Sequence, residues 1–291
     1  MKIIKYFFEF IVIISLFCIF KIIGLKNASS LGSILGKVIG PFFRSKNIIK
    51  QNIKIGLGNL DKKKEEEIIN GMWSNIGRTF AEYIFLKNFK LSKTGFNHIK
   101  ITGIEYLDQI KKSNKPVVFF SGHFANFELM AMELDKFGVK LAAIYRPLNN
   151  FFLNPLMEYL RMKYICPIQI QKGISGSREI IKKIKDEYSI ALMVDQRVSE
   201  GPRLSFFNKE AHTTTIPVQI ALKYNCKLVP IYIERKNGIN FEMVIHEPYE
   251  ITKTGVYEDD LKNNSLTINK NIEKMIIKNP TQWIWTHDRW K

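Results

Sequence analysis

The sequence is poor in cysteine, which argues against two classes of protein. Its 291 residues include only Cys18, Cys166 and Cys226. Because these three are far apart, odd in number and in no Cys-x-x-Cys pair, we expect neither a disulfide framework nor a zinc site. A reducing compartment fits this pattern.

Motifs of several common enzyme classes are also missing. There is no Gly-x-Ser-x-Gly element, no His-Glu-x-x-His pair, no calcium loop and no dinucleotide fingerprint. Gly36-Lys37 is not a phosphate loop, because Val38 stands where Ser or Thr is required. The glycines at every fourth position from Gly32 to Gly40 instead allow a close helix approach, either within this chain or with another helix. We expect no metal and no other cofactor.

Acidic residues are scarce relative to basic ones. The chain has 27 Asp+Glu against 44 Lys+Arg, a formal net charge of +17. Such an excess favours nucleic acid, an anionic membrane surface, a phosphorylated substrate or an acidic carrier protein as partner. General abundance of Lys, Ile and Asn accounts for part of it. Nucleic acid is not expected, since no nucleic-acid-binding module or arginine stripe is present.

One long apolar run lies near the amino terminus. Residues Ile3 to Leu25 are mostly Ile, Phe, Leu and Val, with charges near the two ends. About 20 such residues can cross a hydrocarbon core of about 30 Å. We therefore expect a membrane anchor at residues 1–26, either spanning the bilayer or lying obliquely in one leaflet. A cleaved signal peptide is the alternative, because Lys2 and Lys5 precede the run, but the run is long for one.

Beyond the anchor, the pattern predicts a helical region and then an α/β domain. Residues 27–94 contain apolar residues at helical spacing, with Asp61 as a helix cap. Over residues 95–291 strand-like and helical runs alternate, which indicates a mostly parallel sheet flanked by helices. The expected strands are 116–120, 139–145, 167–171, 190–195 and 227–233, with 241–246 as an edge strand. The expected helices are 151–164, 176–187, 217–224 and 264–278.

The first expected strand leads into a candidate catalytic pair. Apolar residues 116–120 precede Ser121-Gly122, and His123 and Glu128 follow. Five helical steps turn a side chain by about 140°, so the two meet only if His123 lies in the turn and Glu128 in the first helical turn. Glu128 would then accept a ring N–H of His123, leaving the other nitrogen as general base. The alternative is a packing histidine beside a solvated glutamate. The position at a strand's carboxyl end favours a site.

Polar residues after the other strands should join this pair. Because the carboxyl ends of parallel strands share one edge of the sheet, we expect a substrate-binding set there. The set consists of Arg146 and Asn149 after the second expected strand, Asp195 and Gln196 after the fourth, and Arg161 near the end of the expected helix 151–164. Arginine suits phosphate or carboxylate recognition and oxyanion stabilisation, although a surface ion pair is the alternative for each. With no evident protein nucleophile, we expect direct transfer, in which the acceptor's own hydroxyl attacks.

Five motifs occur in order over nearly the whole chain. They are residues 121–128 around His123 and Glu128, 145–149, 195–196, Phe206-Phe207 and the terminal residues 282–291. Together with the N-terminal anchor, they resemble the late acyltransferases of lipid A biosynthesis, the lauroyl and myristoyl transferases of Gram-negative bacteria. Two departures from that family's pattern are Asp288, where many members have a basic residue, and Asn208, where glycine is frequent. Either could mark an altered acceptor site.

The resemblance implies an enzyme on the cytoplasmic face of the inner membrane, with a glycerolipid-acyltransferase-like fold. It would move a fatty acyl group from acyl carrier protein to a hydroxyl on a 3-hydroxyacyl chain of a phosphorylated glucosamine disaccharide. His123 would be the general base and Glu128 its partner, with Asp195-Gln196 in a supporting role. The tryptophan cluster Trp283, Trp285 and Trp290 would lie at the lipid interface or pack in the core.

Two other functions compete with this one. The first is acylation of another glycolipid or of an amino-acid lipid. The second, from a different class, is a basic membrane-tethered protein that binds nucleic acid or anionic lipid. Such a protein would bind with a steep salt dependence and would be indifferent to substitution of His123 and Glu128.

Overall fold

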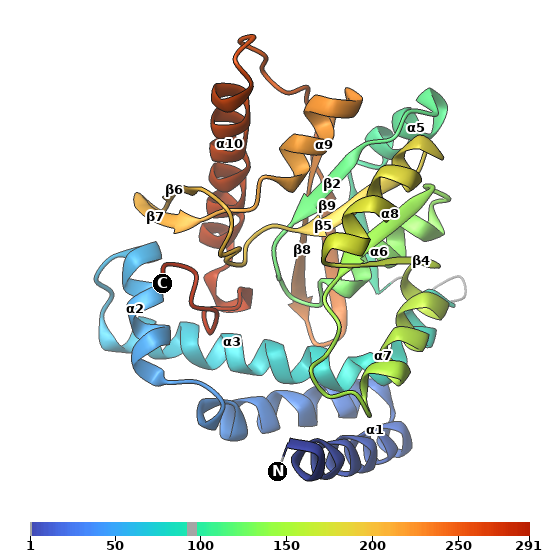
Figure 1. Ribbon diagram of the computed structural model, residues 1–291. Coiled ribbons are helices and arrows are strands. Elements are labelled where there is room, and N and C mark those ends of the chain that lie inside the picture. The colour runs from blue at the N-terminus through green and yellow to red at the C-terminus, as the bar shows by residue number, and fades with distance from the viewer. Residues whose placement is uncertain (1, 92–97) are drawn as a thin grey trace.

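The structure confirms the α/β class with a mostly parallel sheet. The computed structural model describes residues 2–91 and 98–291, and Figure 1 shows its helices around a central sheet. The strands are β1 (Ile99–Thr102), β2 (Val118–Ser121), β3 (Leu141–Tyr145), β4 (Ile168–Gln171), β5 (Ser189–Met193), β6 (Arg203–Phe206), β7 (Lys209–His212), β8 (Leu228–Asn237) and β9 (Asn240–Ile245). The helices are α1 (Lys2–Ile39), α2 (Lys46–Leu57), α3 (Lys62–Glu82), α4 (Leu86–Lys90), α5 (Ile104–Ser113), α6 (Glu128–Lys136), α7 (Asn154–Leu160), α8 (Ile174–Lys185), α9 (Ile216–Tyr224) and α10 (Tyr257–Lys278).

The seven-stranded sheet has the order β1-β9-β8-β2-β5-β3-β4. Strands β8, β2, β5, β3 and β4 are parallel to one another, whereas β9 is antiparallel to β8 and β1 is parallel to β9. Strand β2 is buried along its whole length, which explains its continuous Val-Phe-Phe run. The carboxyl ends of β2, β5 and β3 therefore lie side by side at one edge of the sheet.

Two features of the sheet differ from expectation. Strand β9, expected at an edge, pairs with β8 on one side and with β1 on the other. The edge strand on this side of the sheet is β1, whose four residues are too few to show a periodic pattern in the sequence. The β6–β7 hairpin was also not anticipated, and it forms a separate two-stranded sheet.

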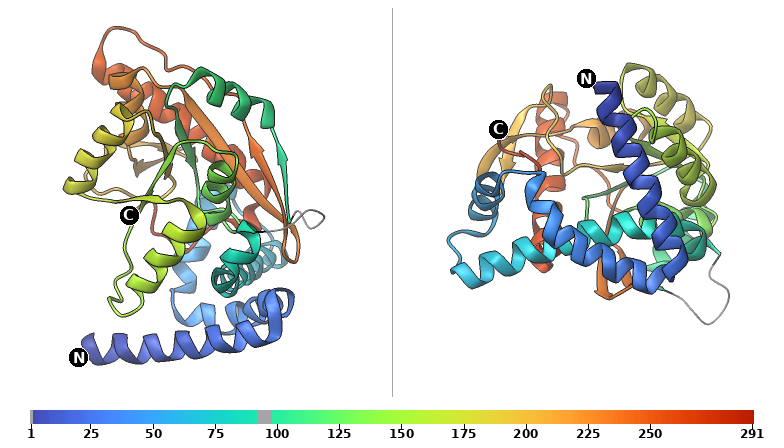
Figure 2. Two further views of the ribbon diagram at one scale, coloured as in Figure 1. Left: turned by 90° about the vertical axis from the view of Figure 1, so that its right-hand side faces the viewer. Right: turned by 90° about the horizontal axis from the view of Figure 1, so that it is seen from below.

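Helix α1 is longer than the expected anchor and is bent at Gly24. Gly24 has a non-helical backbone (φ 80°), and the two parts of the helix lie at an angle (Figure 2). The helix is long and apolar enough to cross a membrane. Its first part leaves a set of large apolar side chains exposed, namely Ile3, Ile4, Phe7, Phe8, Ile11, Val12, Ile19 and Ile22. The domain boundary expected at 94–95 lies outside the described residues.

The second part of α1 packs against α3 through glycines. A Cβ atom at Gly36 would lie 2.2 Å from the carbonyl oxygen of Trp73, and one at Gly77 would lie 2.0 Å from that of Gly32. Because such contacts are too short for any larger residue, the glycine spacing serves close packing within this chain. Asp61 caps α3 as expected, its carboxylate accepting a hydrogen bond of 2.8 Å from the backbone N–H of Lys64.

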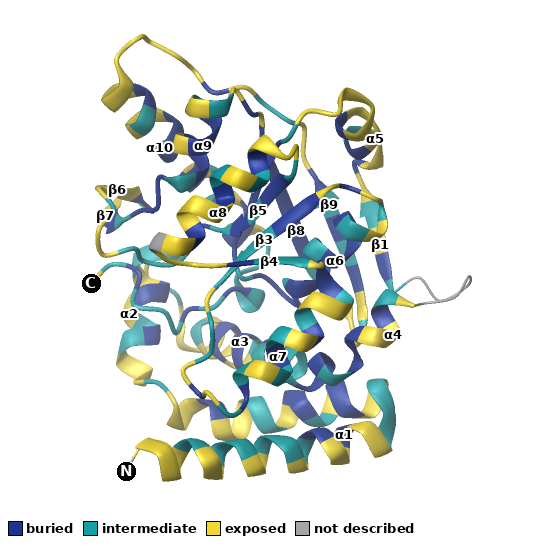
Figure 3. Cartoon of the chain, turned by 45° about the vertical axis from the view of Figure 1, so that its right-hand side comes forward, coloured by how far each residue is buried: buried dark blue, intermediate teal, exposed yellow. Residues whose placement is uncertain are grey.

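Helices α1 and α3 also reach the loops that leave the sheet. The side-chain amide of Asn150, after β3, donates to the carbonyl oxygen of Tyr6 at 2.9 Å. The Thr79 hydroxyl of α3 donates to the carbonyl oxygen of Ala125, after β2, at 3.1 Å. Figure 3 shows buried residues concentrated in the strands and exposed ones along α1. The N-terminal helices thus support the edge of the sheet where the candidate site lies.

The C-terminal tryptophans pack mainly in the core. Trp283 and Trp285 are buried, and their ring centroids are 4.6 Å apart. Trp290 is half-buried, and its indole N–H donates to the carbonyl oxygen of Phe206 at 3.0 Å. The packing alternative is therefore correct for Trp283 and Trp285, because neither side chain is accessible to lipid.

Candidate active site

His123 lies in the loop between β2 and α6, and Glu128 is the first residue of α6. These are the positions that the sequence predicted. The loop is tightly turned, since Ala125 has a positive φ of 45°. A non-glycine residue adopts this conformation only when its surroundings hold it there.

The imidazole of His123 is held by Asp195. Its Nδ1 lies 2.7 Å from Oδ1 of Asp195, and the backbone N–H of His123 donates to Oδ2 at 2.8 Å. The indole N–H of Trp283 also donates to Oδ2, at 2.8 Å. Asp195 is only 3% exposed, so three hydrogen bonds fix a carboxylate that is shielded from water. The Nε2 atom of the ring is left as the nitrogen that can accept a proton.

The electrostatics of this pair follow from its burial and short distance. Burial alone would lower the pKa of His123, but the Asp195 carboxylate outweighs it and the pKa lies above its usual value. Burial alone would raise the pKa of Asp195, but His123 and the other donors lower it to about 2. Asp195 is therefore ionised at neutral pH and stabilises the protonated form of the imidazole.

Glu128 has different partners from those expected. We expected its carboxylate to accept the ring N–H of His123. This expectation is wrong for the Nδ1 atom, because the hydrogen-bond partner of Nδ1 is Asp195. Glu128 Oε1 accepts from Arg161 at 2.7 and 3.1 Å and from the Tyr83 hydroxyl at 3.2 Å. The reason is geometric: α6 starts beside the short π-helical turn Arg161–Ile165, whose arginine reaches the first turn of α6.

The partner of His123 is explained by strand register. In the parallel pair β2 and β5, Ser121 lies opposite Met193. Two residues further along, His123 and Asp195 leave adjacent strands at equivalent positions. Sequence reasoning placed both residues at the right edge but could not pair them, because it did not establish which strands are neighbours.

A cavity of about 440 Å³ opens beside His123. Six of the seven expected site residues line it, and the seventh, Asp195, is buried against His123. These six are His123, Glu128, Arg146, Asn149, Arg161 and Gln196. Apolar side chains from α6 and from the central strands form much of the remaining wall, including Phe127, Met130, Leu134 and Ile144. The cavity therefore combines a basic, polar region with an apolar interior.

Three basic side chains at this cavity have no ionic partner. Arg146, Lys172 and Arg197 all line it, and their side chains make no hydrogen bond or ion pair with any residue that the structure describes. Arg161 is paired with Glu128, but its Nη1 atom is buried without a partner among the described residues. Lys172 was not identified from the sequence, although it follows β4 as Arg146 follows β3.

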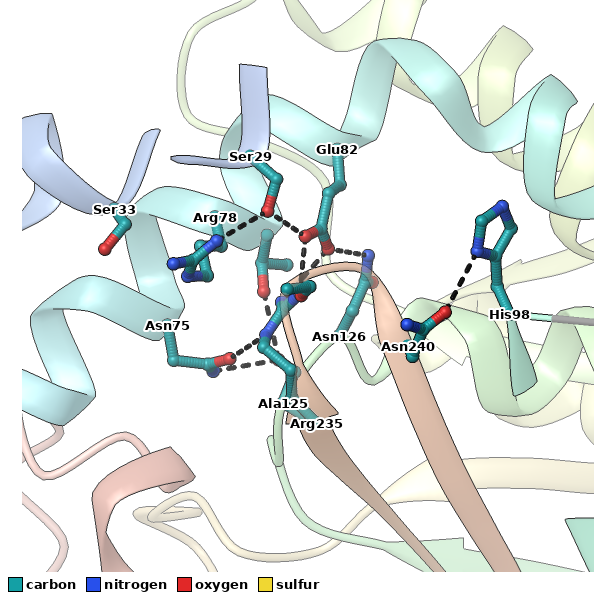
Figure 4. Close-up of polar contacts among 12 residues, drawn as sticks. Ser29, Ser33, Asn75, Arg78, Glu82, His98, Ala125, Asn126, Arg235 and Asn240 are labelled. Carbon is teal, nitrogen blue, oxygen red and sulfur yellow. Dashed lines mark hydrogen bonds and ion pairs between the residues drawn. The ribbon is translucent and has the colours of Figure 1, made fainter. Parts of the chain in front are cut away.

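A buried polar network connects the loop of His123 to the N-terminal helices and to β8 (Figure 4). Glu82 is fully buried and accepts from Ser29, Asn126 and Arg235 at 2.7, 2.9 and 3.0 Å. The side chain of Asn75 donates to the Ala125 carbonyl oxygen at 3.1 Å. Residues of α1, α3 and β8 thus fix the strained loop between β2 and α6. No local sequence pattern predicts this network, because its members are far apart in the chain.

Asn208 and Asp288, the two expected departures from the motif pattern, have different structural settings. Phe207 and Asn208 form the two-residue turn of the β6–β7 hairpin, with φ of 53° and 57°. Such a turn requires positive φ at both positions, and asparagine tolerates this better than most residues. Asn208 therefore fits the backbone conformation that this turn requires. Asp288 lies near Arg44, with 3.8 Å between the charged groups.

Comparison with known proteins agrees with the motif pattern. The family model for bacterial lipid A biosynthesis acyltransferases matches residues 1–291. The lipid A biosynthesis lauroyltransferase of Escherichia coli K12 is 23% identical over 270 residues, covering 90% of this chain and 84% of that protein. The palmitoleoyltransferase of the same organism is 23% identical over 272 residues, with the same coverage. A lipid A biosynthesis acyltransferase of Haemophilus influenzae is 24% identical over 257 residues, covering 84% and 76%.

The fold and the basic, apolar-lined cavity beside His123 fit an enzyme that transfers acyl groups, and the relatives identify the protein as an acyltransferase. The chain belongs to the bacterial lipid A biosynthesis acyltransferase family.

Proposed function

We propose that this enzyme transfers a fatty acyl group from acyl carrier protein to a hydroxyl of a 3-hydroxyacyl chain on a lipid A precursor. The observation that carries the proposal is the position of His123. Its ring is fixed by Asp195 through Nδ1 and borders a cavity with an apolar interior and basic side chains. An apolar chain and a charged head group both find complementary surroundings there.

In the proposed reaction, Nε2 of His123 removes the proton of the acceptor hydroxyl. The oxygen attacks the thioester carbonyl of the donor, and a new C–O bond forms. The C–S bond then breaks, and the leaving sulfur takes the proton from His123. Asp195 keeps the other ring proton on Nδ1, so that Nε2 is unprotonated in the neutral ring and can act as general base.

The developing oxyanion needs a hydrogen-bond donor, and we assign this role to Arg161. Glu128 holds the guanidinium of Arg161 at the cavity by accepting from its Nε and Nη2 atoms, and the Nη1 atom has no hydrogen-bond partner among the described residues. Burial alone would lower the pKa of Arg161, but the charge of Glu128 raises it above the usual value, so the group stays cationic. In this proposal Glu128 positions Arg161, and it does not position the base His123.

The membrane attachment is part of the same proposal. Many large apolar side chains of α1 are exposed, whereas Phe17 and Phe20 are buried and pack against Phe80 of α3. We propose that α1 remains as a membrane anchor at the inner membrane, with the α/β domain on the cytoplasmic face. Sequencing the amino terminus of the mature protein tests for cleavage. Protease accessibility in inverted and right-side-out vesicles tests the orientation.

Basic groups at the cavity also fit an acidic carrier protein and a phosphorylated acceptor. We further propose that the catalytic domain is glycerolipid-acyltransferase-like, in that its histidine and acidic residue flank the turn after a central strand. The competing acceptors, another glycolipid or an amino-acid lipid, use the same chemistry. Nucleic acid is not proposed as a partner.

The decisive experiment has a chemical and a cellular part. In purified membranes, the His123→Ala variant should transfer acyl groups from acyl carrier protein about 10²–10⁴-fold more slowly than the unaltered enzyme. This is the range expected for loss of a general base. Mass spectrometry of lipid A from cells lacking the gene should show loss of one secondary acyl chain. Unchanged transfer by His123→Ala, or an unchanged lipid A profile, would overturn the proposal.

A further inference from the structure

A second cavity adjoins the first one at the end of α1. It has a volume of about 630 Å³ and is lined by residues from four regions: the segment after α1, helix α3, the loop after β5 and the C-terminal tail. The two cavities share Gln196, Arg197 and His287 as lining residues. A single ligand that passes these three side chains can therefore occupy both.

Two arginines give the second cavity its charge. Arg44 and Arg197 both line it, and the Nε atom of each is buried without a hydrogen-bond partner among the described residues. Arg197 makes no ion pair with any residue that the structure describes. Arg44 has one acidic neighbour, Asp288, at 3.8 Å with both side chains about one third exposed. A contact this long and exposed is weak, so both guanidinium groups are free to bind an anion.

The surroundings of the cavity are apolar and accessible. Phe42 and Phe43 immediately precede Arg44, and they are 87% and 80% exposed. Ile34, Val38 and Ile39, in the second part of α1, are also exposed. Trp73 and Ile76 of α3 form part of the cavity wall. An occupant would thus meet apolar rings at the rim and cationic groups inside, the combination that suits the head group of an amphipathic lipid.

We propose that Arg44 and Arg197 bind a phosphate group in the head group of the glycolipid acceptor. This inference rests on the proposed function, and it assigns the acceptor's charged end to the second cavity. Arginine binds phosphate oxygens through parallel N–H donors, which gives both affinity and orientation. With the phosphate at Arg44 and Arg197, an acyl chain of the same molecule extends past Gln196 toward His123. The phosphate subsite thereby selects which hydroxyl reaches the base.

Asp288 provides an internal control for the proposal, because its carboxylate has a charge of the same sign as the phosphate. Its carboxylate competes with a phosphate for Arg44 and repels the bound anion. Removing this charge should therefore strengthen acceptor binding, whereas removing the charge of Arg44 should weaken it. A merely structural role for the Arg44 and Asp288 contact predicts the same sign for both changes.

The test measures steady-state kinetics with two acceptors, the bis-phosphorylated glycolipid and the same lipid after enzymatic removal of its phosphates. For Arg44→Ala we expect KM for the phosphorylated acceptor to rise about tenfold or more, and much less for the dephosphorylated one. Arg44→Lys should recover part of the loss, and Asp288→Asn should lower KM for the phosphorylated acceptor. Lys46→Ala is the matched control, since Lys46 is exposed nearby and lines neither cavity.

Three outcomes would overturn the subsite. These are an equal rise of KM for both acceptors, a rise confined to the acyl carrier protein donor, and a rise of the same size in Lys46→Ala. If Arg44→Ala is unfolded in a thermal melt, Arg44→Lys and Asp288→Asn still decide the direction in which KM changes.

Binding to vesicles of neutral phospholipid with and without the phosphorylated lipid separates this inference from the proposed function. If the unaltered enzyme and Arg44→Ala bind these vesicles equally, the subsite is refuted even where the enzyme acylates the acceptor. A failure to acylate refutes only the function.

Discussion

The carboxylate of Glu82 and the guanidinium of Arg235 form an ion pair inside the protein, where Glu82 has no exposed surface and Arg235 only 8%. Ser29 of α1 and Asn126 of the loop between β2 and α6 also donate to Glu82. One buried charge pair therefore connects the N-terminal helix, α3, strand β8 and the loop that carries His123.

Removing one member of this pair should destabilise the protein strongly. Glu82→Gln leaves Arg235 with an uncompensated buried charge, and the expected loss is about 3–5 kcal/mol of the free energy of unfolding. Glu67→Ala removes the exposed partner of Lys64 and should cost about 0–1 kcal/mol. Thermal or denaturant unfolding in detergent measures both variants. Equal losses in the two would contradict the importance given to the buried pair.

The pH profile should report the His123–Asp195 pair. A general base works only when neutral, so kcat/KM should fall as pH drops through the pKa of His123. Because Asp195 raises that pKa, the acid limb of the unaltered enzyme should lie above the ordinary histidine value of about 6.5.

Asp195→Asn removes the charge that raises this pKa. Its acid limb should therefore move to lower pH, and its maximal rate should fall about 10²–10⁴-fold, because the ring loses its fixed tautomer and orientation. Rates with acyl carrier protein between pH 5 and 9 measure both effects. An acid limb that stays in place would show that Asp195 does not control the base.

Glu128→Gln distinguishes the observed arrangement from the expected one. If Glu128 positions Arg161, this variant should lower kcat strongly but move the acid limb less than Asp195→Asn does. The reason is that Asp195, and not Glu128, is hydrogen-bonded to the Nδ1 atom of His123. A shift as large as that of Asp195→Asn would restore the sequence-based assignment of Glu128 as the orienting acid.

Asn208→Gly should leave the enzyme essentially unchanged. The residue lies in a turn at φ 57°, which glycine adopts without strain. Stability should change by less than about 1 kcal/mol, and KM for the acceptor should stay the same. Asn208→Val is the contrasting variant, since a β-branched residue disfavours this conformation and should destabilise the hairpin. A changed acceptor KM in Asn208→Gly would reopen a role for this position in specificity.

Much of the architecture follows from local sequence patterns. The apolar run of β2, the helical periodicity of α3 and the cap at Asp61 each depend on neighbours in the chain, so they could be predicted. The short strand β1 and the internal place of β9 depend on pairing partners about 140 residues apart. No local pattern contains that information.

The sequence by itself determined the family, through motifs in a fixed order, and the positions of His123 and Glu128 on either side of a turn. It also placed Arg146, Asn149, Asp195 and Gln196 at the carboxyl ends of strands, and Arg161 near the end of a helix. Only the tertiary structure decided which carboxylate holds which cation or imidazole. That choice depends on the adjacency and register of β2 and β5 and on the position of Arg161 beside α6, which arise when the sheet and its helices pack together.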